Sequence, residues 1–308
     1  MICRAPMPTI EGLFYDYYTP IKLVGKRPRT IKTYKMIVGR WNCYKQTVPI
    51  DSIGSAEIAG FQAFVLQTCG PATANSYCRH LMAMLRFAAD EDVGLLDRPP
   101  KCSKLKEHKN SPLALTVEEF SKVLATAREW PGEIAGYPAS VWWTALLLVC
   151  WETGLRYTAL LLLRSIDMLF DSAGLLCQAD TQKDKEAMWF DLPPHVLDAV
   201  QAIHDPTREL LFPRDVTIET VGKWFRVILD NSGIYAPKGS GMRFHRIRKS
   251  KASYTEANGG DAQKALGHSA RSVTERYLDP RIVGRAKQPP MPSPLLYASE
   301  KPRFRVYG

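Results

Sequence analysis

The chain has 308 residues, of which 45% are hydrophobic, and this length predicts two globular domains rather than one. Lysine and arginine number 41 against 31 aspartates and glutamates, which gives a formal net charge of +10. This excess favours a polyanionic partner, either nucleic acid or an acidic membrane surface, and composition does not choose between them.

The cysteines and the apolar segments exclude several classes of protein. Seven cysteines are scattered and never form a CxxC pair, which indicates reduced thiols rather than a disulfide framework or a zinc site. The N-terminal MICRAPMPTIEG lacks an apolar core of signal-peptide length. Residues 141–163 are apolar, but Glu152, Gly154 and Arg156 interrupt them. A charged residue at the centre of a membrane-spanning helix costs about 2.5–3.5 kcal/mol on scales of membrane insertion, which argues against a membrane span. We therefore expect two buried helices joined by a tight turn, in a cytoplasmic protein.

The N-terminal part predicts a small, basic, all-helical bundle. Helices are expected at 30–46, 56–67 and 72–90, because apolar residues recur in each at helical spacing. Thr30 is a candidate N-cap for the first helix. Residues 97–112, DRPPKCSKLKEHKNSP, follow as a basic linker. This composition fits a linker that crosses a phosphate backbone, and it fits an ordinary solvated linker equally well.

Helices dominate again from LTVEEFSKVLATA, residue 115 onward, with one interruption. Residues 165–192 alternate and turn like a short antiparallel sheet, with TQKDKE as its hairpin loop. Further helices are predicted at 194–204, 218–231, 244–258 and 261–266. The chain is therefore expected to be mainly α with a small antiparallel β-sheet, and it ends in a proline-rich, then basic and aromatic, tail.

Polar residues in four separate stretches become informative in combination. Each has an ordinary explanation when taken alone, as a solvated surface residue or as a core residue. His245 and Arg248 are three apart on a predicted helix and hence share a face. In chain order the stretches hold Arg156 in TGLR, Lys183 in TQKDKE, His245 and Arg248 in HRIR, His268 in LGHS, and Tyr277 nine residues after that histidine.

This order of motifs resembles the tyrosine recombinase (phage integrase) family, and the resemblance covers most of the chain. PRTIKTY and PATANSYCRHLMAMLRFA look like the family's core-binding domain. The resemblance implies a helical, SAM-like core-binding domain, a basic linker, an α+β catalytic domain and a C-terminal tail, at 8–96, 97–112, 113–285 and 286–308. It also implies a site-specific recombinase or integrase of a prophage or mobile element, which cleaves and rejoins DNA through a 3′-phosphotyrosyl intermediate.

The chemistry of phosphodiester cleavage agrees with the roles that the resemblance implies. Arg156 and Arg248 stay protonated and can clamp the non-bridging oxygens bidentately. Tyr277 supplies the attacking oxygen, and a phenol with a pKa of about 10 leaves more readily than an alkoxide, so the covalent link is reversible. By resemblance Lys183 is the general acid for the 5′ oxygen, with Lys185 as the alternative.

The remaining roles and partners follow from the same resemblance. His245 and His268 are expected to donate to the phosphate or to help move the tyrosine proton. No cofactor is expected, since the sequence has no HExxH motif, no cysteine–histidine ligand spacing and no P-loop. The implied partners are double-stranded DNA, three further copies in a homotetramer on two DNA sites, and an accessory DNA-bending or directionality protein. A nucleoid-associated location without membrane contact is implied.

Two departures from the family pattern keep alternatives open. The family usually has an acidic residue three positions after the first arginine, where this chain has Ala159, and often a histidine after the second, where it has Lys249. Glu152 or Asp180 is a candidate substitute for the missing carboxylate. The alternatives are a DNA-binding regulator derived from a weakened integrase, and a type IB topoisomerase. A metal-dependent nuclease would have to use the carboxylates of the lysine-rich loop, Asp180, Asp184 and Glu186.

Overall fold

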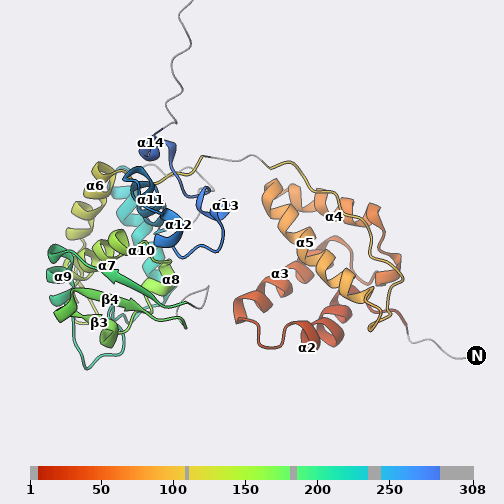
Figure 1. Cartoon of the computed structure of the whole chain (residues 1–308). Helices are drawn as coiled ribbons and strands as arrows, with labels where there is room; N and C mark the ends of the chain where they lie inside the picture. The colour runs from red at the N-terminus through yellow and green to blue at the C-terminus, as the bar shows by residue number, and fades with distance from the viewer. Residues whose placement is uncertain (1–5, 108–110, 181–185, 235–243, 285–308) are drawn as a thin grey trace, which may run out of the picture. The chain divides into compact units, whose positions relative to one another are not determined.

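The computed structural model describes residues 6–107, 111–180, 186–234 and 244–284 (Figure 1). The chain divides into two compact units, Met1–Lys109 and Asn110–Gly308. Each unit has its own apolar core, and the two cores share no residue.

Helices are the main elements in the described part of the N-terminal unit, which confirms the predicted bundle; one isolated β-bridge joins Thr9 to Pro49. Trp41, Phe61 and Leu81, one from each of the three long helices, are fully or almost fully buried in its core. The third helix begins at Pro28, so Thr30 lies inside the first turn instead of capping it. The elements are α1 (Ile10–Gly12), the π-helical η1 (Leu13–Tyr18), α2 (Thr19–Lys22), α3 (Pro28–Tyr44), η2 (Ile50–Ser52), α4 (Ser55–Leu66) and α5 (Pro71–Ala88).

The first part of the predicted linker packs on this helical unit. The Asn75 side chain donates to the Leu105 carbonyl and accepts from its N–H, both at 2.9 Å. Gln62 donates to the Ser103 carbonyl at 3.1 Å. These bonds fix the segment along α4 and α5.

In the C-terminal unit, helices surround α7, whose sequence is almost continuously apolar. Trp142, Trp143 and Leu146 are fully buried there, and α6, α9 and α11 pack against the helix. A helix that is apolar on every side belongs in a protein core. The described helices are α6 (Val117–Arg128), α7 (Ala139–Thr153), α8 (Tyr157–Leu160), α9 (Pro194–Gln201), α10 (Ile218–Asn231), α11 (Phe244–Ala257), α12 (Ala262–Ala265), α13 (Arg271–Thr274) and α14 (Pro280–Val283).

Two small antiparallel sheets complete this unit. Strands β3 (Met168–Leu169), β4 (Gly174–Cys177) and β5 (Met188–Asp191) pair in that order, and Cys177 lies opposite Met188 at the loop end of the hairpin. The predicted first strand is shorter than expected, because 3₁₀ turns flank it at η3 (Ser165–Asp167) and η4 (Phe170–Ser172). A second hairpin, β1 (Glu133–Ile134) with β2 (Tyr137–Pro138), was not predicted. The expected class, mainly α with a small antiparallel sheet, is confirmed.

The segment 141–163 forms two helices, α7 and α8, joined by a turn at Gly154, as predicted. No helix in the described ranges is both long enough and apolar enough to span a membrane.

Candidate active site

A glycine turn fixes the first arginine. Gly154 ends α7 with φ 61°, a left-handed conformation that favours glycine. A Cβ atom there would lie 2.9 Å from Cβ and Cγ of Lys251 on α11, so conformation and space both require glycine. Arg156 follows in an extended conformation, at φ −64° and ψ 138°, and precedes α8 as its N-cap residue. The turn thereby brings the Gly154 carbonyl against α11.

Arg248 on α11 ties three segments together. Its Nη1 donates to the Gly154 carbonyl at 2.7 Å, and its Nη2 donates to the Leu266 carbonyl at 2.7 Å. The same Nη2 lies 3.1 Å from Nε2 of His268. Because the guanidinium is 2% exposed, these contacts hold it in one orientation.

His268 is held at its backbone and at its ring. Its N–H donates to the Gln263 carbonyl at 3.0 Å, and the Gln263 side chain donates to the His268 carbonyl at 3.1 Å. The ring Nδ1 lies 3.0 Å from the Thr274 hydroxyl oxygen. The imidazole therefore sits buried between Arg248 and Thr274.

Tyr277 completes the cluster within one chain. Its ring centroid lies 4.8 Å from that of His268 and 4.9 Å from that of His245. The central guanidinium carbon of Arg248 lies 5.8 Å from the same ring centroid. Ser253 of α11 donates from its hydroxyl to the Tyr277 carbonyl at 3.3 Å. The phenol thus lies among two imidazoles and a guanidinium.

The electrostatic environment keeps His245 neutral. Burial is the largest cause that lowers the pKa of its imidazole, and the positive charges of Arg248, Lys249 and Arg156 lower it further, to about 4. His245 is therefore uncharged near neutral pH. Arg156 contributes to this field, so the two arginines of the predicted site act on the same imidazole.

The hairpin that carries the predicted lysines touches the LGHS turn. Gly267 has φ 60°, and a Cβ on it would lie 3.1 Å from the Met188 sulfur at the start of β5. Lys183 and Lys185 themselves lie outside the described residues. The contact brings the loop end of the hairpin beside the residue that precedes His268.

The position expected to be acidic is part of the apolar core. Ala159 on α8 is 1% exposed and packs among apolar side chains. Glu152 and Asp180, the candidates to replace the missing carboxylate, each form an ion pair with another residue. Glu152 lies 4.0 Å from the ammonium of Lys251, and Asp180 lies 3.8 Å from the guanidinium of Arg164.

The sequence analysis missed two residues that support the site, Thr274 and Asp279. Asp279 is 1% exposed and accepts from the Ala114 N–H and from Arg281, both at 2.8 Å. Burial alone would raise the pKa of Asp279, but the bonds from Arg281 and Ala114 lower it on balance. Ser253 accepts from the Asp279 N–H at 2.8 Å. These bonds anchor the chain directly after Tyr277.

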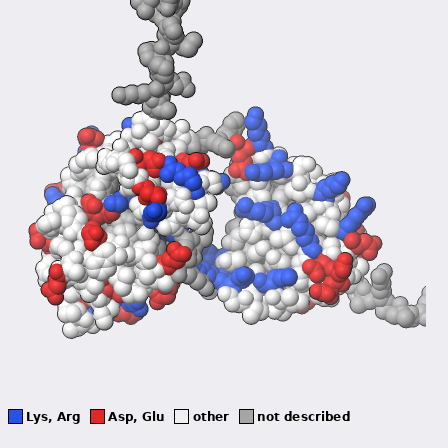
Figure 2. Space-filling model, in the orientation of Figure 1, with Lys and Arg blue, Asp and Glu red and all other residues white. Residues whose placement is uncertain are grey.

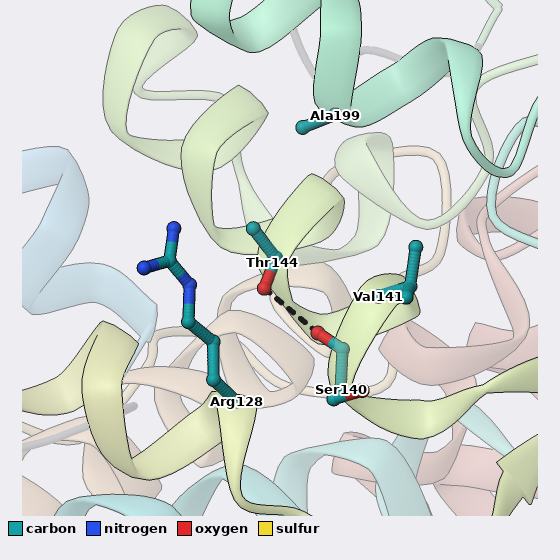
Figure 3. Close-up of a pocket in the computed structure, with 5 residues that line it drawn as sticks. All are labelled: Arg128, Ser140, Val141, Thr144 and Ala199. Carbon is teal, nitrogen blue, oxygen red and sulfur yellow. Dashed lines mark hydrogen bonds between the residues drawn. The ribbon is translucent and has the colours of Figure 1, made fainter.

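A shallow pocket of about 290 Å³ lies elsewhere in the unit (Figure 3). Ser140, Val141 and Thr144 line it at the start of α7, with Arg128 and Ala199 from the neighbouring helices. At a rise of 1.5 Å per residue, the fourteen steps from Ser140 to Gly154 put the two ends of α7 roughly 20 Å apart. The pocket is therefore separate from the cluster around Tyr277.

Comparison with known proteins shows what the chain as a whole is similar to. Residues 114–282, more than half of the chain, match the phage integrase family. The chain is 24% identical over 288 residues to the tyrosine recombinase XerA of Thermococcus onnurineus (strain NA1), covering 88% of this chain and 92% of that protein.

Solved structures share the fold. A lambda integrase dimer bound to a COC′ core site has a TM-score of 0.71 at 18% identity, covering 89% of this chain and 96% of that one. A lambda integrase tetramer bound to a Holliday junction has a TM-score of 0.70 at 19% identity, with coverages of 91% and 79%. The Tn1549 transposon integrase with a circular intermediate DNA has a TM-score of 0.71 at 16% identity, with coverages of 88% and 95%. The protein belongs to the phage integrase family and is a tyrosine recombinase-type enzyme.

Proposed function

We propose that this protein is a site-specific recombinase that cleaves and rejoins double-stranded DNA through a 3′-phosphotyrosyl intermediate. The observation that supports the proposal most is the position of Tyr277, whose ring lies within 5 Å of two imidazole rings and faces the buried Arg248. A phenol next to fixed cationic donors suits attack on a phosphodiester, because the charge that develops on phosphorus-bound oxygens meets preorganised donors.

In the proposed cleavage step, Arg156 and Arg248 bind the non-bridging oxygens of the scissile phosphate. The phenolic oxygen of Tyr277 attacks phosphorus, a phosphotyrosyl bond forms, and the bond from phosphorus to the 5′ oxygen breaks. His245, neutral because of its lowered pKa, has a lone pair that accepts the phenolic proton. Lys183, or Lys185, gives a proton to the leaving 5′ oxygen.

Rejoining reverses these proton transfers. The 5′ hydroxyl of a partner strand attacks the phosphotyrosyl phosphorus, and Tyr277 leaves with the proton that it lost. The bond energy of the cleaved strand stays in the phosphotyrosyl link, so strand exchange needs no nucleotide cofactor. His268, fixed by Arg248 and Thr274, is proposed to contact the phosphate.

DNA binding is assigned first to the N-terminal unit. Figure 2 shows lysine and arginine side chains spread over the visible face of this unit, with most of the visible acidic side chains toward one edge. Exposed basic residues on α3 and α5 include Lys32, Lys35, Arg79 and Arg86. Such residues bind phosphates and position the protein without reading sequence.

We also propose a domain organisation and an assembly on DNA for this chain. Residues 8–96 would be the core-binding domain, 97–112 the linker, 113–285 the catalytic domain and 286–308 the tail, which lies outside the described residues. Lambda integrase forms a dimer on a core site and a tetramer on a Holliday junction. We propose a homotetramer on two DNA sites, assisted by an accessory DNA-bending or directionality protein. It would act in the cytoplasm, at the nucleoid, for a prophage or other mobile element.

A library of nicked duplexes tests the proposal. The full chain and a Tyr277→Phe variant are incubated with the library in chelator, denatured in detergent, and the DNA that stays attached is sequenced. DNA retained by the wild-type chain alone would support the proposal and give the target sequence. Cleavage that chelator abolishes would point to a metal-dependent nuclease. Relaxation of supercoiled DNA that lacks the captured sequence would point to a type IB topoisomerase.

One observation favours a second candidate, a regulator that binds DNA without cutting it. The position where the family usually has a carboxylate is a buried alanine, Ala159. A weakened site would bind DNA in the same library and retain none after denaturation. That outcome, in a library that contains the preferred binding site, would replace the recombinase by the regulator.

A further inference from the structure

We propose that Thr274 is a positioning residue that sets the tautomer of His268 and links this histidine to Tyr277, an inference that rests on the proposed function. Thr274 ends the short helix α13 and is fully buried. Its hydroxyl oxygen lies 3.0 Å from Nδ1 of His268, and its carbonyl accepts from the Tyr277 N–H at 2.8 Å. Thr274 thus contacts both His268 and Tyr277, the two residues of this segment that the proposed reaction uses.

The neighbours of His268 determine where its proton lies. A guanidinium has N–H donors and no acceptor, so Nη2 of Arg248 donates and Nε2 of His268 accepts. In a neutral imidazole the other nitrogen then carries the hydrogen. Nδ1–H therefore donates to the Thr274 hydroxyl, which lies 3.0 Å from that nitrogen.

This arrangement gives the threonine hydroxyl a specific function. A hydrogen bond to one ring nitrogen fixes the tautomer and orientation of the other. Thr274 therefore stabilises the tautomer that turns the Nε2 lone pair toward Arg248, because its hydroxyl accepts the Nδ1 hydrogen. A second proton on the ring would place two donors 3.1 Å apart, so the neutral form is the one that the contacts favour. The hydrogen bond from the Tyr277 N–H to the Thr274 carbonyl also holds the backbone of Tyr277, and so helps to position its phenol.

The test compares Thr274→Val, which keeps the shape and removes the hydroxyl, with Thr274→Ser, which keeps the hydroxyl. Thr144→Val is the matched control, because the hydroxyl of that half-buried threonine donates to the Ser140 carbonyl of its own helix, in the pocket away from Tyr277 (Figure 3). We expect covalent complexes with a captured nicked duplex to form at least about tenfold more slowly with Thr274→Val, equivalent to 1.36 kcal/mol in the barrier. Thr274→Ser should restore most of the rate, and DNA affinity should not change.

The second readout is the tautomer itself. With ¹⁵N-labelled histidine, the His268 signals, assigned with a His268→Asn variant, should show a protonated Nδ1 and an unprotonated Nε2 in the wild type and in Thr274→Ser. Thr274→Val should show a mixture, and its rate should change with pH differently from the wild type, which loss of packing alone would not cause. A protonated Nε2 in the wild-type chain, or a wild-type rate and tautomer in Thr274→Val, would overturn the inference. If the wild type forms no covalent complex at all, the proposed function fails, whereas the tautomer measurement still tests Thr274.

Discussion

At the scale of single residues, the site is a cluster of groups whose burial and positive charge lower the pKa of one imidazole, His245. His245 faces cations from its own helix, Arg248 and Lys249, and from another segment, Arg156; the His268 imidazole also lies near it, and Tyr277 packs on its ring. A histidine in such a field stays neutral, and its neutrality has a measurable cost for stability in acid.

We expect His245 to make the C-terminal unit less stable as the pH falls. The pKa of His245 is about 4 in the folded chain, against 6.5 for an ordinary histidine, so between these values only the unfolded chain takes up the proton. Above the unfolded pKa the group contributes nothing, and below it stability is lost by up to about 1.4 kcal/mol per pH unit until the folded pKa is reached. We would measure the free energy of unfolding in urea at several pH values between neutral and pH 5. It should fall less steeply with pH for His245→Asn than for the wild type. Equal slopes would contradict the pKa, and His195→Asn, at an exposed position, is the control.

The sequence predicted the residues of this cluster better than it predicted their supports. Tyr277 and the two histidines were found because their motifs are specific in combination, and the structure brings them together. Thr274 and Asp279 were missed, because their roles depend on contacts with residues far along the chain or with one particular ring nitrogen. No periodicity or local spacing carries that information. The expected carboxylate at 159 is absent, and the structure shows why alanine fits there: the position is in the apolar core.

At the scale of elements, the turn between α7 and α8 depends on one glycine. Gly154→Ala would place a Cβ against Lys251 and force an alanine into a left-handed conformation. We expect a loss of about 2–4 kcal/mol in the free energy of unfolding, from backbone strain and the contact together. Because the Gly154 carbonyl accepts from Arg248, covalent capture should fall as well. Chemical denaturation and capture measure both effects, and Gly39→Ala, in open space on α3, is the control. A Gly154→Ala variant with wild-type stability and covalent capture would contradict the requirement for glycine at this turn.

The segment after Tyr277 depends on a buried carboxylate. Asp279→Asn removes the charge that pairs with Arg281 while keeping the shape, and we expect a loss of about 2 kcal/mol, since Arg281 is partly exposed and screened by solvent. The pKa of Asp279 is lowered in the folded chain, so this stabilisation is present above about pH 4 and is lost as the pH falls below it. Urea unfolding at neutral pH should separate Asp279→Asn from Asp198→Asn, a control on the exposed side of α9. Equal stabilities would contradict the anchor.

At the scale of the whole molecule, the helices and the small sheet were predictable because apolar periodicity and turn residues are local signals. The short β1–β2 hairpin was not, because two-residue strands carry too little pattern. The packing of residues 101–105 on α4 and α5 was also unpredictable, since the side chains of Gln62 and Asn75 make those bonds across the unit.

The net charge of +10 predicts salt-sensitive DNA binding. Each phosphate that the protein neutralises adds about 0.9 to the slope of log K against log salt. Replacing both Lys32 and Lys35 on α3 by alanine should weaken binding to all duplexes alike and reduce the slope by roughly 2. Met36→Ala, which removes an exposed uncharged side chain from the same helix, should leave the slope unchanged. An unchanged slope in the double variant would place the phosphate contacts elsewhere.

The most direct test of the central claim is to locate the DNA on the protein. Covalent complexes formed in chelator are digested with protease and nuclease, and mass spectrometry identifies the peptide that carries a nucleotide. We predict a 3′-linked nucleotide on the phenolic oxygen of Tyr277, absent from Tyr277→Phe and present in Tyr254→Phe, which alters another half-buried tyrosine of the same unit. A nucleotide on any other residue, or attachment that persists in Tyr277→Phe, would contradict the assignment of Tyr277 as the nucleophile.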